Sequence, residues 1–220
     1  EAFMKNFEFP EQFDIAEFIS EEAHDLKSPF NRILGFTKML MKGMSGPITD
    51  MQKDDLTTVY QNGSQAMTMM SNLVDMARLS RGEKSFTPAE SEANRLLGQM
   101  IAYWKQNKTD KEVDFDSVCF ASEIPISADE PLLRQGILNL CLYLAEYTKL
   151  PCKITITVEP DPQGLLFSLR SQGVRNPIPV EIDLTMSAYI GQQIVKLHGG
   201  QFRKTEGDEN GGLIEFVLPK

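Results

Sequence analysis

Long apolar runs, paired cysteine motifs and a surplus of basic residues are all missing from this sequence of 220 residues. No apolar run approaches the roughly 20 residues of a membrane-spanning helix, so we expect no membrane contact from this segment. Cys119, Cys141 and Cys152 lack the spacing of a zinc site or a disulfide framework, which favours buried thiols in a reducing compartment and no bound metal. The 22 basic and 31 acidic side chains give a net charge of −9, which argues against binding to nucleic acid.

Two long segments near the N-terminus carry apolar residues at helical spacing. In residues 14–42 the steps alternate between three and four, as in a coiled coil. Residues 43–47 break this helix, because glycine is conformationally free and proline cannot donate in a helix interior. Thr49 or Asp50 is expected to cap a second helix with the same pattern. The stripe positions are Ile19, Ala23, Leu26, Phe30, Ile33, Thr37 and Leu40, then Leu56, Val59, Gly63, Ala66, Met70, Leu73 and Ala77.

The two segments together predict a helical hairpin that has more apolar surface than one hairpin can bury. Methionine and phenylalanine residues lie beyond the stripe, namely Phe36, Met39, Met41, Met67, Met69 and Met76. Two hairpins packed as a four-helix bundle would bury these side chains. We therefore expect a homodimer through the hairpin.

The rest of the sequence mixes helical and strand-like patterns. We expect a short strand at 85–87, a helix at 90–107, and strand-like stretches at 113–118 and around Ile124. A helix at 130–147 is followed by alternating strands at 153–159 and 165–170, which a turn at 161–164 connects. A helix at 186–197 ends at His198 and two glycines, and strands at 201–204 and 213–218 form an antiparallel pair. This order predicts an α+β sandwich in which one sheet is covered by helices.

A histidine in the first helix has neighbours that suit phosphoryl chemistry. His24 follows a stripe position, so its imidazole should project into water, where an unprotonated ring nitrogen can act as a nucleophile. Asp25 is placed to hold the ring tautomer and accept its proton, and Ser28 lies one turn further along the same face. Pro29 removes a helical hydrogen bond and should bend the helix. A histidine and aspartate alone are more often an ordinary surface pair, so the combination carries the argument.

Residues 22–29, which read Glu-Ala-His-Asp-Leu-Lys-Ser-Pro, resemble the H box of sensor histidine kinases, and residues 73–79 resemble the end of their second helix. The resemblance implies that His24 is the phosphoacceptor and that Asp25 is its acid/base partner. It also implies that Ser28 stands where a threonine or asparagine normally assists dephosphorylation. Residues 1–83 are therefore expected to form the dimerisation and histidine phosphotransfer hairpin.

Residues 84–220 resemble the ATP-binding domain of the same kinases. Residues 129–140 resemble the approach to the N box, and residues 194–200 and 211–216 match later parts of the domain. The resemblance implies a sandwich of the Bergerat or HATPase type. It makes Asn139 a candidate for cofactor binding, although a lone asparagine on a helix is more often structural.

This second half departs from the family pattern where nucleotide would bind. Tyr143 stands in place of the N-box asparagine that helps to hold Mg²⁺, and Glu146 replaces a basic residue. In the glycine boxes Ser171 replaces the adenine-binding aspartate, Arg175 replaces a glycine, and residues 185–188 contain no glycine. Residues 176–185 leave no room for a long lid. Glycine lets backbone approach phosphate closely and Mg²⁺ needs oxygen ligands, so the nucleotide site is expected to be degenerate.

The sequence as a whole favours a cytoplasmic phosphorelay protein derived from a histidine kinase. His24 would exchange phosphoryl groups with the aspartate of a response-regulator receiver domain, without autophosphorylation from ATP and without a cofactor of its own. One alternative is an active sensor kinase with a divergent site that still binds Mg-ATP, and another is a non-catalytic dimeric scaffold. Because the chain begins at Glu1 without an initiator methionine, we also consider it the cytoplasmic part of a longer sensor protein.

Overall fold

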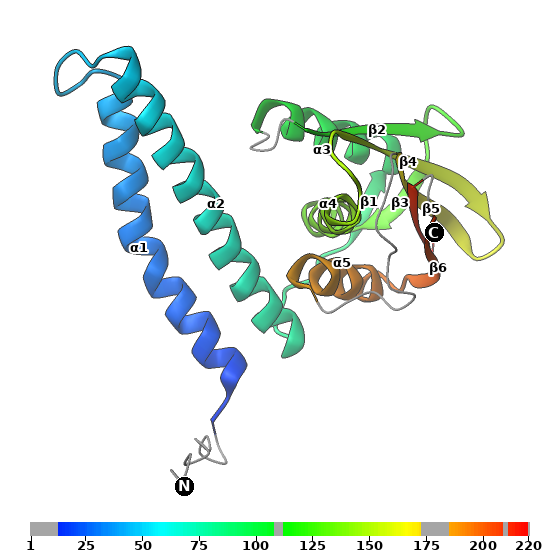
Figure 1. Cartoon of the computed structure of the whole chain (residues 1–220). Helices are drawn as coiled ribbons and strands as arrows, with labels where there is room; N and C mark the ends of the chain where they lie inside the picture. The colour runs from blue at the N-terminus through cyan, green and yellow to red at the C-terminus, as the bar shows by residue number, and fades with distance from the viewer. Residues whose placement is uncertain (1–12, 108–111, 173–184, 209–210, 220) are drawn as a thin grey trace, which may run out of the picture. The chain divides into compact units, whose positions relative to one another are not determined.

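The chain divides into two compact units, Glu1–Glu83 and Lys84–Lys220, which Figure 1 shows as a helical pair and a domain containing a sheet. The computed structural model describes residues 13–107, 112–172, 185–208 and 211–219. Each unit is described below by itself.

The first unit is a hairpin of helices α1 (Ile15–Met41) and α2 (Asp50–Ser80). Asp14 caps α1, because its Oδ1 accepts hydrogen bonds from the backbone N–H groups of residues 16 and 17 at 2.9 and 3.0 Å. Thr49, rather than Asp50, caps α2 in a reciprocal capping box with Gln52. Both predicted helices are confirmed.

The seam between α1 and α2 is formed by small and medium side chains, with Ala23, Met70 and Val74 at its centre. A Cβ atom at Gly63 would lie 2.8 Å from Cδ2 of Leu34, so the absence of a side chain lets the helices approach closely there. Three positions of the predicted stripe, Leu26, Ile33 and Val59, are not covered within the single hairpin and are 50%, 47% and 46% exposed. A stripe with that spacing is wider than the face that one partner helix covers, so its edge remains outside this hairpin.

The second unit contains seven strands and three helices among its described residues, in the order given by the chain. They are β1 (Ala89–Glu92), α3 (Ala93–Asn107), β2 (Val113–Cys119), β3 (Pro125–Ala128), α4 (Glu130–Glu146), β4 (Cys152–Asp161), β5 (Gly164–Gln172), α5 (Met186–Leu197), β6 (Gln201–Asp208) and β7 (Gly211–Leu218). The main sheet has the order β2-β4-β5-β7-β6, and only the β2–β4 pair is parallel. The predicted sandwich of helices and a sheet is confirmed.

Three details of the expected second unit were wrong. Residues 85–87 form no strand; the strand lies at 89–92, and α3 therefore begins at Ala93 rather than near residue 90. A second sheet of two strands also exists, because β1 pairs with β3 from Ala89–Ala128 to Glu92–Pro125. These strands have four residues each, too short for a clear alternating pattern.

Helices α3, α4 and α5 lie together on one side of the main sheet in Figure 1. Alternate residues of β4 and β5 point into the core beneath them and are fully buried, namely Ile154, Ile156, Val158, Leu165, Phe167 and Leu169. Burying one such side chain stabilises the fold by roughly 1.5–3 kcal/mol. The core thus fixes α4, which carries the N-box counterpart, against the sheet.

Helices α4 and α5 pack closely because glycines face side chains at their crossing. A Cβ atom at Gly136 would lie 2.7 Å from Ile194, and one at Gly191 would lie 2.6 Å from Leu140. His198, the C-cap of α5, accepts a hydrogen bond from the Asp129 backbone N–H at Nε2 (3.2 Å), while Nδ1 lies 2.8 Å from the Ile194 carbonyl oxygen. The buried ring therefore links the end of α5 to the beginning of α4.

Candidate functional site

The strongest candidate is the His24 region of α1. The His24 side chain is 81% exposed and its Nδ1 lies 3.4 Å from Oδ1 of Asp25, whose side chain is 86% exposed. Ser28 is also exposed and lies one helical turn after His24, closer to the turn that joins α1 to α2. The carboxylate is therefore able to orient the ring with the hydrogen on Nδ1, which leaves Nε2 with a free lone pair.

Helix α1 continues through Pro29, so the residues around His24 remain on one helix. Ala23, directly before the histidine, is 3% exposed and lies in the seam with α2. Because successive helical residues are about 100° apart, a buried Ala23 fixes the direction in which His24 projects. The sequence placed His24 outside the seam for this reason, and its exposure agrees with that expectation.

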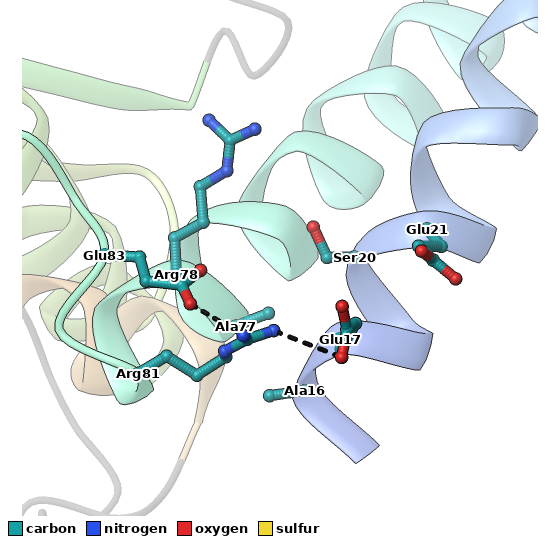
Figure 2. A pocket seen from close by; sticks show the side chains of 8 residues that line it. All are labelled: Ala16, Glu17, Ser20, Glu21, Ala77, Arg78, Arg81 and Glu83. Atoms are coloured by element: carbon teal, nitrogen blue, oxygen red, sulfur yellow. Dashed lines mark ion pairs between the residues drawn. The ribbon is translucent and has the colours of Figure 1, made fainter. Parts of the chain in front are cut away.

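A pocket of about 230 Å³ opens at the end of the hairpin where α1 begins and α2 ends. Figure 2 shows its lining, which is Ala16, Glu17, Ser20, Glu21, Ala77, Arg78, Arg81 and Glu83. The sequence analysis did not identify this pocket, because its lining comes from residues some sixty positions apart that no single motif contains.

Arg81 holds several carboxylates at this end of the hairpin. Its guanidinium lies 2.7 Å from a carboxylate oxygen of Glu83, 3.6 Å from one of Asp14 and 3.8 Å from one of Glu17. The Glu17 backbone N–H, followed by the Ala16 N–H and the charge of Arg81, holds the pKa of Asp14 below its ordinary value against a smaller opposing effect of desolvation. Figure 2 shows the Arg78 side chain extended away from this group.

In the second unit, the N-box counterparts are buried in α4. Tyr143 has no exposed surface, and its ring lies 5.1 Å from the ring of Tyr147. Asn139 is 5% exposed, and its Nδ2 donates a hydrogen bond to the Gln135 carbonyl oxygen at 2.9 Å. Within the described parts of the chain, Oδ1 of Asn139 has no hydrogen-bond partner.

Ser171, the counterpart of the adenine-binding aspartate, is 1% exposed and bonded inside the domain. Its Oγ accepts a hydrogen bond from the Gly212 backbone N–H at 2.8 Å and lies 3.0 Å from Oγ1 of Thr148. Oγ1 of Thr148 in turn donates to the Leu144 carbonyl oxygen at 2.8 Å. Because each hydroxyl has one hydrogen, a chain from Gly212 through Ser171 and Thr148 to Leu144 satisfies every group.

The counterpart of the second glycine box is the beginning of α5. Thr185 caps this helix and its Oγ1 accepts a hydrogen bond from the Ala188 N–H at 3.2 Å. Glu146 lies at the last residue of α4, where partial burial raises the pKa of its carboxyl group. The predictions on Arg175 and on residues 176–184 fall outside the described residues.

The candidate residues therefore form two groups. His24, Asp25 and Ser28 share one face of α1 in the first unit, whereas Asn139 lies in α4 of the second. Over residues 13–107, 112–172, 185–208 and 211–219, no three His, Cys, Asp or Glu side chains are grouped so that they could hold a metal ion. In the same ranges, no helix combines the length and apolarity required to cross a bilayer.

Comparison with known proteins agrees with this geometry. Residues 14–82 match the family described as the His Kinase A (phospho-acceptor) domain. The histidine protein kinase DivJ of Caulobacter vibrioides is 21% identical over 142 residues, which are 64% of this chain and 24% of DivJ. The chain thus spans about a quarter of that relative.

Solved structures of two further histidine kinases share the fold. Full-length ShkA, in complex with AMPPNP, matches 93% of this chain and 46% of its own with a TM-score of 0.69 at 19% identity. The catalytic domain of ThkA matches 62% of this chain and 98% of its own chain, with a TM-score of 0.51 at 25% identity. ThkA in complex with the response regulator TrrA matches 93% of this chain and 61% of its own chain, with a TM-score of 0.56 at 22% identity. The resemblance to the core of a sensor histidine kinase is confirmed: residues 14–82 match the phospho-acceptor family, and the second unit shares the fold of a histidine kinase catalytic domain.

Proposed function

We propose that this chain is a phosphotransfer protein of a two-component pathway, in which His24 exchanges a phosphoryl group with the aspartate of a response-regulator receiver domain. The exposure of His24 carries the proposal: its side chain is 81% exposed on a helix of a phospho-acceptor domain. An exposed imidazole nitrogen on a helix can reach a phosphorus atom held by a docked partner, which a buried one cannot.

The transfer to His24 assigns a separate role to each neighbour. Nε2 attacks the phosphorus, the P–O bond to the receiver aspartate breaks, and the aspartate leaves as a carboxylate. Asp25, 3.4 Å from Nδ1, stabilises the tautomer with hydrogen on Nδ1 and accepts that proton as the ring nitrogen gains its phosphorus bond. Ser28, one turn away, is positioned to orient a water molecule when the phosphoryl group is hydrolysed.

The second unit fits Mg-ATP poorly at each counterpart residue. Ser171 offers no carboxylate to an adenine amino group, and its hydroxyl is already bonded to Gly212 and Thr148. Tyr143 is packed into the core, where a phenol is a poor substitute for an amide oxygen on Mg²⁺. The Thr185 hydroxyl already accepts the hydrogen bond from the Ala188 N–H at the beginning of α5, a donor that a bound phosphate would otherwise use. We infer that the domain does not phosphorylate His24 from ATP.

The exposed apolar side chains of α1 favour a homodimer. Ile15, Phe18, Leu26, Ile33 and Phe36 are between 46% and 63% exposed. Their spacing places them on one face of the helix, on the opposite side from His24 by the helical period. A second copy of this hairpin would cover the face in a four-helix bundle and leave both His24 rings in water.

A receiver domain is the partner that this chemistry requires. It supplies both the phosphorylated aspartate and the Mg²⁺ that assists phosphoryl transfer. ThkA, which shares the fold, was solved in complex with the response regulator TrrA. For this chain we propose that docking uses the hairpin surface around His24, and that the pathway's receiver acts both as donor and as acceptor.

The test follows the fate of labelled phosphate on the purified chain and its His24→Gln variant. The chain is first titrated with Mg-ATP by calorimetry and incubated with ATP labelled at the γ-phosphate. It is then incubated with phosphorylated receiver domains. We expect no saturable ATP binding, no label from ATP, and acid-labile label from a receiver that is lost in His24→Gln. Saturable binding with label from ATP on His24 would contradict the proposal and establish an active kinase.

An active kinase with a divergent site is the second candidate, because the buried Oδ1 of Asn139 has no hydrogen-bond partner among the described residues. Such an oxygen can accept a hydrogen bond or coordinate a metal ion. A single amide oxygen does not make a Mg²⁺ site, which needs several oxygen ligands. A scaffold without catalysis is distinguished by the same variant, since His24→Gln would then retain full signalling.

A further inference from the structure

The charges around His24 are unfavourable for the product of the proposed transfer. A phosphoryl group adds roughly −1.5 to −2 charges at neutral pH. Asp25 already lies 3.4 Å from the ring, and Glu21 precedes His24 by three residues, within one helical turn. Phosphorylation thus brings three anionic groups together, and cations nearby would be needed to offset their repulsion.

The side chains of two cations in this part of the hairpin, Lys27 and Arg78, form no ion pair or hydrogen bond among the residues that the structure describes. Lys27 follows His24 by three residues, and its side chain is half-buried beside the α1–α2 seam. Arg78 on α2 lines the hairpin pocket together with Ser20 and Glu21, which precede His24 by four and three residues. In contrast, Arg81 in the same pocket is engaged by Glu17 and Glu83.

The direction of the Arg78 side chain supports a role at His24. Figure 2 shows it pointing away from Arg81, in the direction in which α1 runs from Ala16 to Glu21. His24 follows Ser20 and Glu21 by four and three residues, so the helical period places it on the same face of α1, one turn further along. Guanidinium groups bind phosphate oxygens through paired N–H donors, and ammonium groups bind them as point charges.

We propose, on the basis of the function proposed above, that Lys27 and Arg78 are positioning residues that hold the phosphoryl group transferred to His24. Lys27 approaches from the same helix and Arg78 from α2, so the two cations reach the phosphoryl group from different helices. Their attraction acts on the anionic donor as it arrives and on the phosphohistidine once it has formed. Asp25 remains the proton acceptor and takes no part in holding the phosphoryl group.

Phosphoramidate tests this without ATP or a receiver. The P–N bond of phosphoramidate breaks, a P–N bond to His24 forms, and ammonia leaves with the proton that the ring releases. Intact mass measures the rate of phosphorylation and the subsequent loss of phosphate. The chain contains two histidines, and His198 is 8% exposed with both ring nitrogens engaged, so His24→Gln gives the background.

We expect Lys27→Met and Arg78→Met each to slow phosphorylation about threefold to tenfold at low salt, with a smaller effect near 1 M salt. Lys27→Arg and Arg78→Lys should recover most of the rate. Lys38→Met is the matched control, because Lys38 is an exposed cation of α1 about 21 Å along the helix from His24. Circular dichroism spectra of all variants should match that of the parent chain.

The outcomes separate this inference from the function on which it rests. Equal rates in Lys27→Met, Arg78→Met and Lys38→Met, with His24 labelled in each, would overturn the role of the two cations and leave the proposed function intact. A loss that salt does not reduce and that the conservative variants do not rescue would also contradict it. A parent chain that takes no label at His24 from phosphoramidate or from a phosphorylated receiver would overturn the proposed function itself.

Discussion

Ser171 stands where the family has its adenine-binding aspartate. Replacing it by alanine tests whether its hydroxyl is committed to hydrogen bonds within the second unit. The substitution removes the acceptor of the Gly212 N–H, a bond of 2.8 Å, and the partner of Thr148 at 3.0 Å. Ser171 is 1% exposed and Gly212 is buried, so water cannot replace the lost acceptor. An unsatisfied buried N–H costs about 1–3 kcal/mol, and we expect the free energy of unfolding to fall by that amount.

The single tryptophan makes the measurement specific to the second unit. Trp104 lies in α3, its ring is 4.8 Å from that of Phe115, and its Nε1 donates to the Val113 carbonyl oxygen. Its fluorescence during urea unfolding of the full chain therefore reports the sheet domain and not the hairpin. Ser168→Ala is the matched control on the same strand, because Ser168 is only half-buried and its hydroxyl bonds the Glu215 side chain at 3.2 Å. We expect the control to change stability by less than about 0.5 kcal/mol.

Two further variants make the reasoning refutable. Thr148→Val should cost about 1 kcal/mol, and its effect should not add to that of Ser171→Ala, because the two hydroxyls belong to one chain of hydrogen bonds. Ser171→Asp restores the family's residue type at a position that is already filled, so we expect no gain in ATP affinity. An unchanged stability in Ser171→Ala, additive effects in the double variant, or ATP binding by Ser171→Asp would each show that the domain is not closed in this way.

Three other predictions concern the proposed dimer, the sheet domain and the packing of its helices. Phe36→Glu should convert the proposed dimer into monomers in sedimentation velocity, whereas Met44→Glu, in the exposed turn between the helices, should leave it unchanged. Burial raises the pKa of Asp129, but hydrogen bonds from Thr87 and from the Leu132 backbone outweigh it and hold that pKa below its ordinary value. Its contribution should therefore be present above about pH 4 and lost as the pH falls below it, a dependence that Asp129→Asn should flatten in tryptophan-monitored unfolding. Gly191→Ala should destabilise the second unit by about 1–3 kcal/mol in the same assay, since its Cβ would meet Leu140 at 2.6 Å.

Local patterns in the sequence predicted the elements that local forces determine. The Thr49 cap, the helix break at residues 43–47 and the alternation of β4 and β5 each depend on residues that are neighbours in the sequence, and the structure confirms them. The β1–β3 pair joins Ala89 to Ala128, and no short window of sequence contains both partners. Its existence could not be predicted from periodicity for that reason.

The candidate sites also differ in whether their residues are close together or far apart in the sequence. His24, Asp25 and Ser28 fall within five residues, so one motif identified all three. The bonds of Ser171 reach Thr148 and Gly212, which lie 23 and 41 residues away in the chain. The sequence could show that the family's aspartate was missing there. Only the structure shows that the remaining serine is satisfied by the domain itself.

Exposure separates the groups that can meet another molecule from those that serve the fold. The imidazole of His24 is 81% exposed, while Tyr143, Ser171 and Asn139, at the positions where the family binds nucleotide, are at most 5% exposed. The buried hydroxyl of Ser171 is already bonded within its own domain, and a ligand would first have to break those bonds. A nucleophile on an exposed helix face meets no such cost, so phosphoryl groups should reach this chain from a partner that docks on the hairpin.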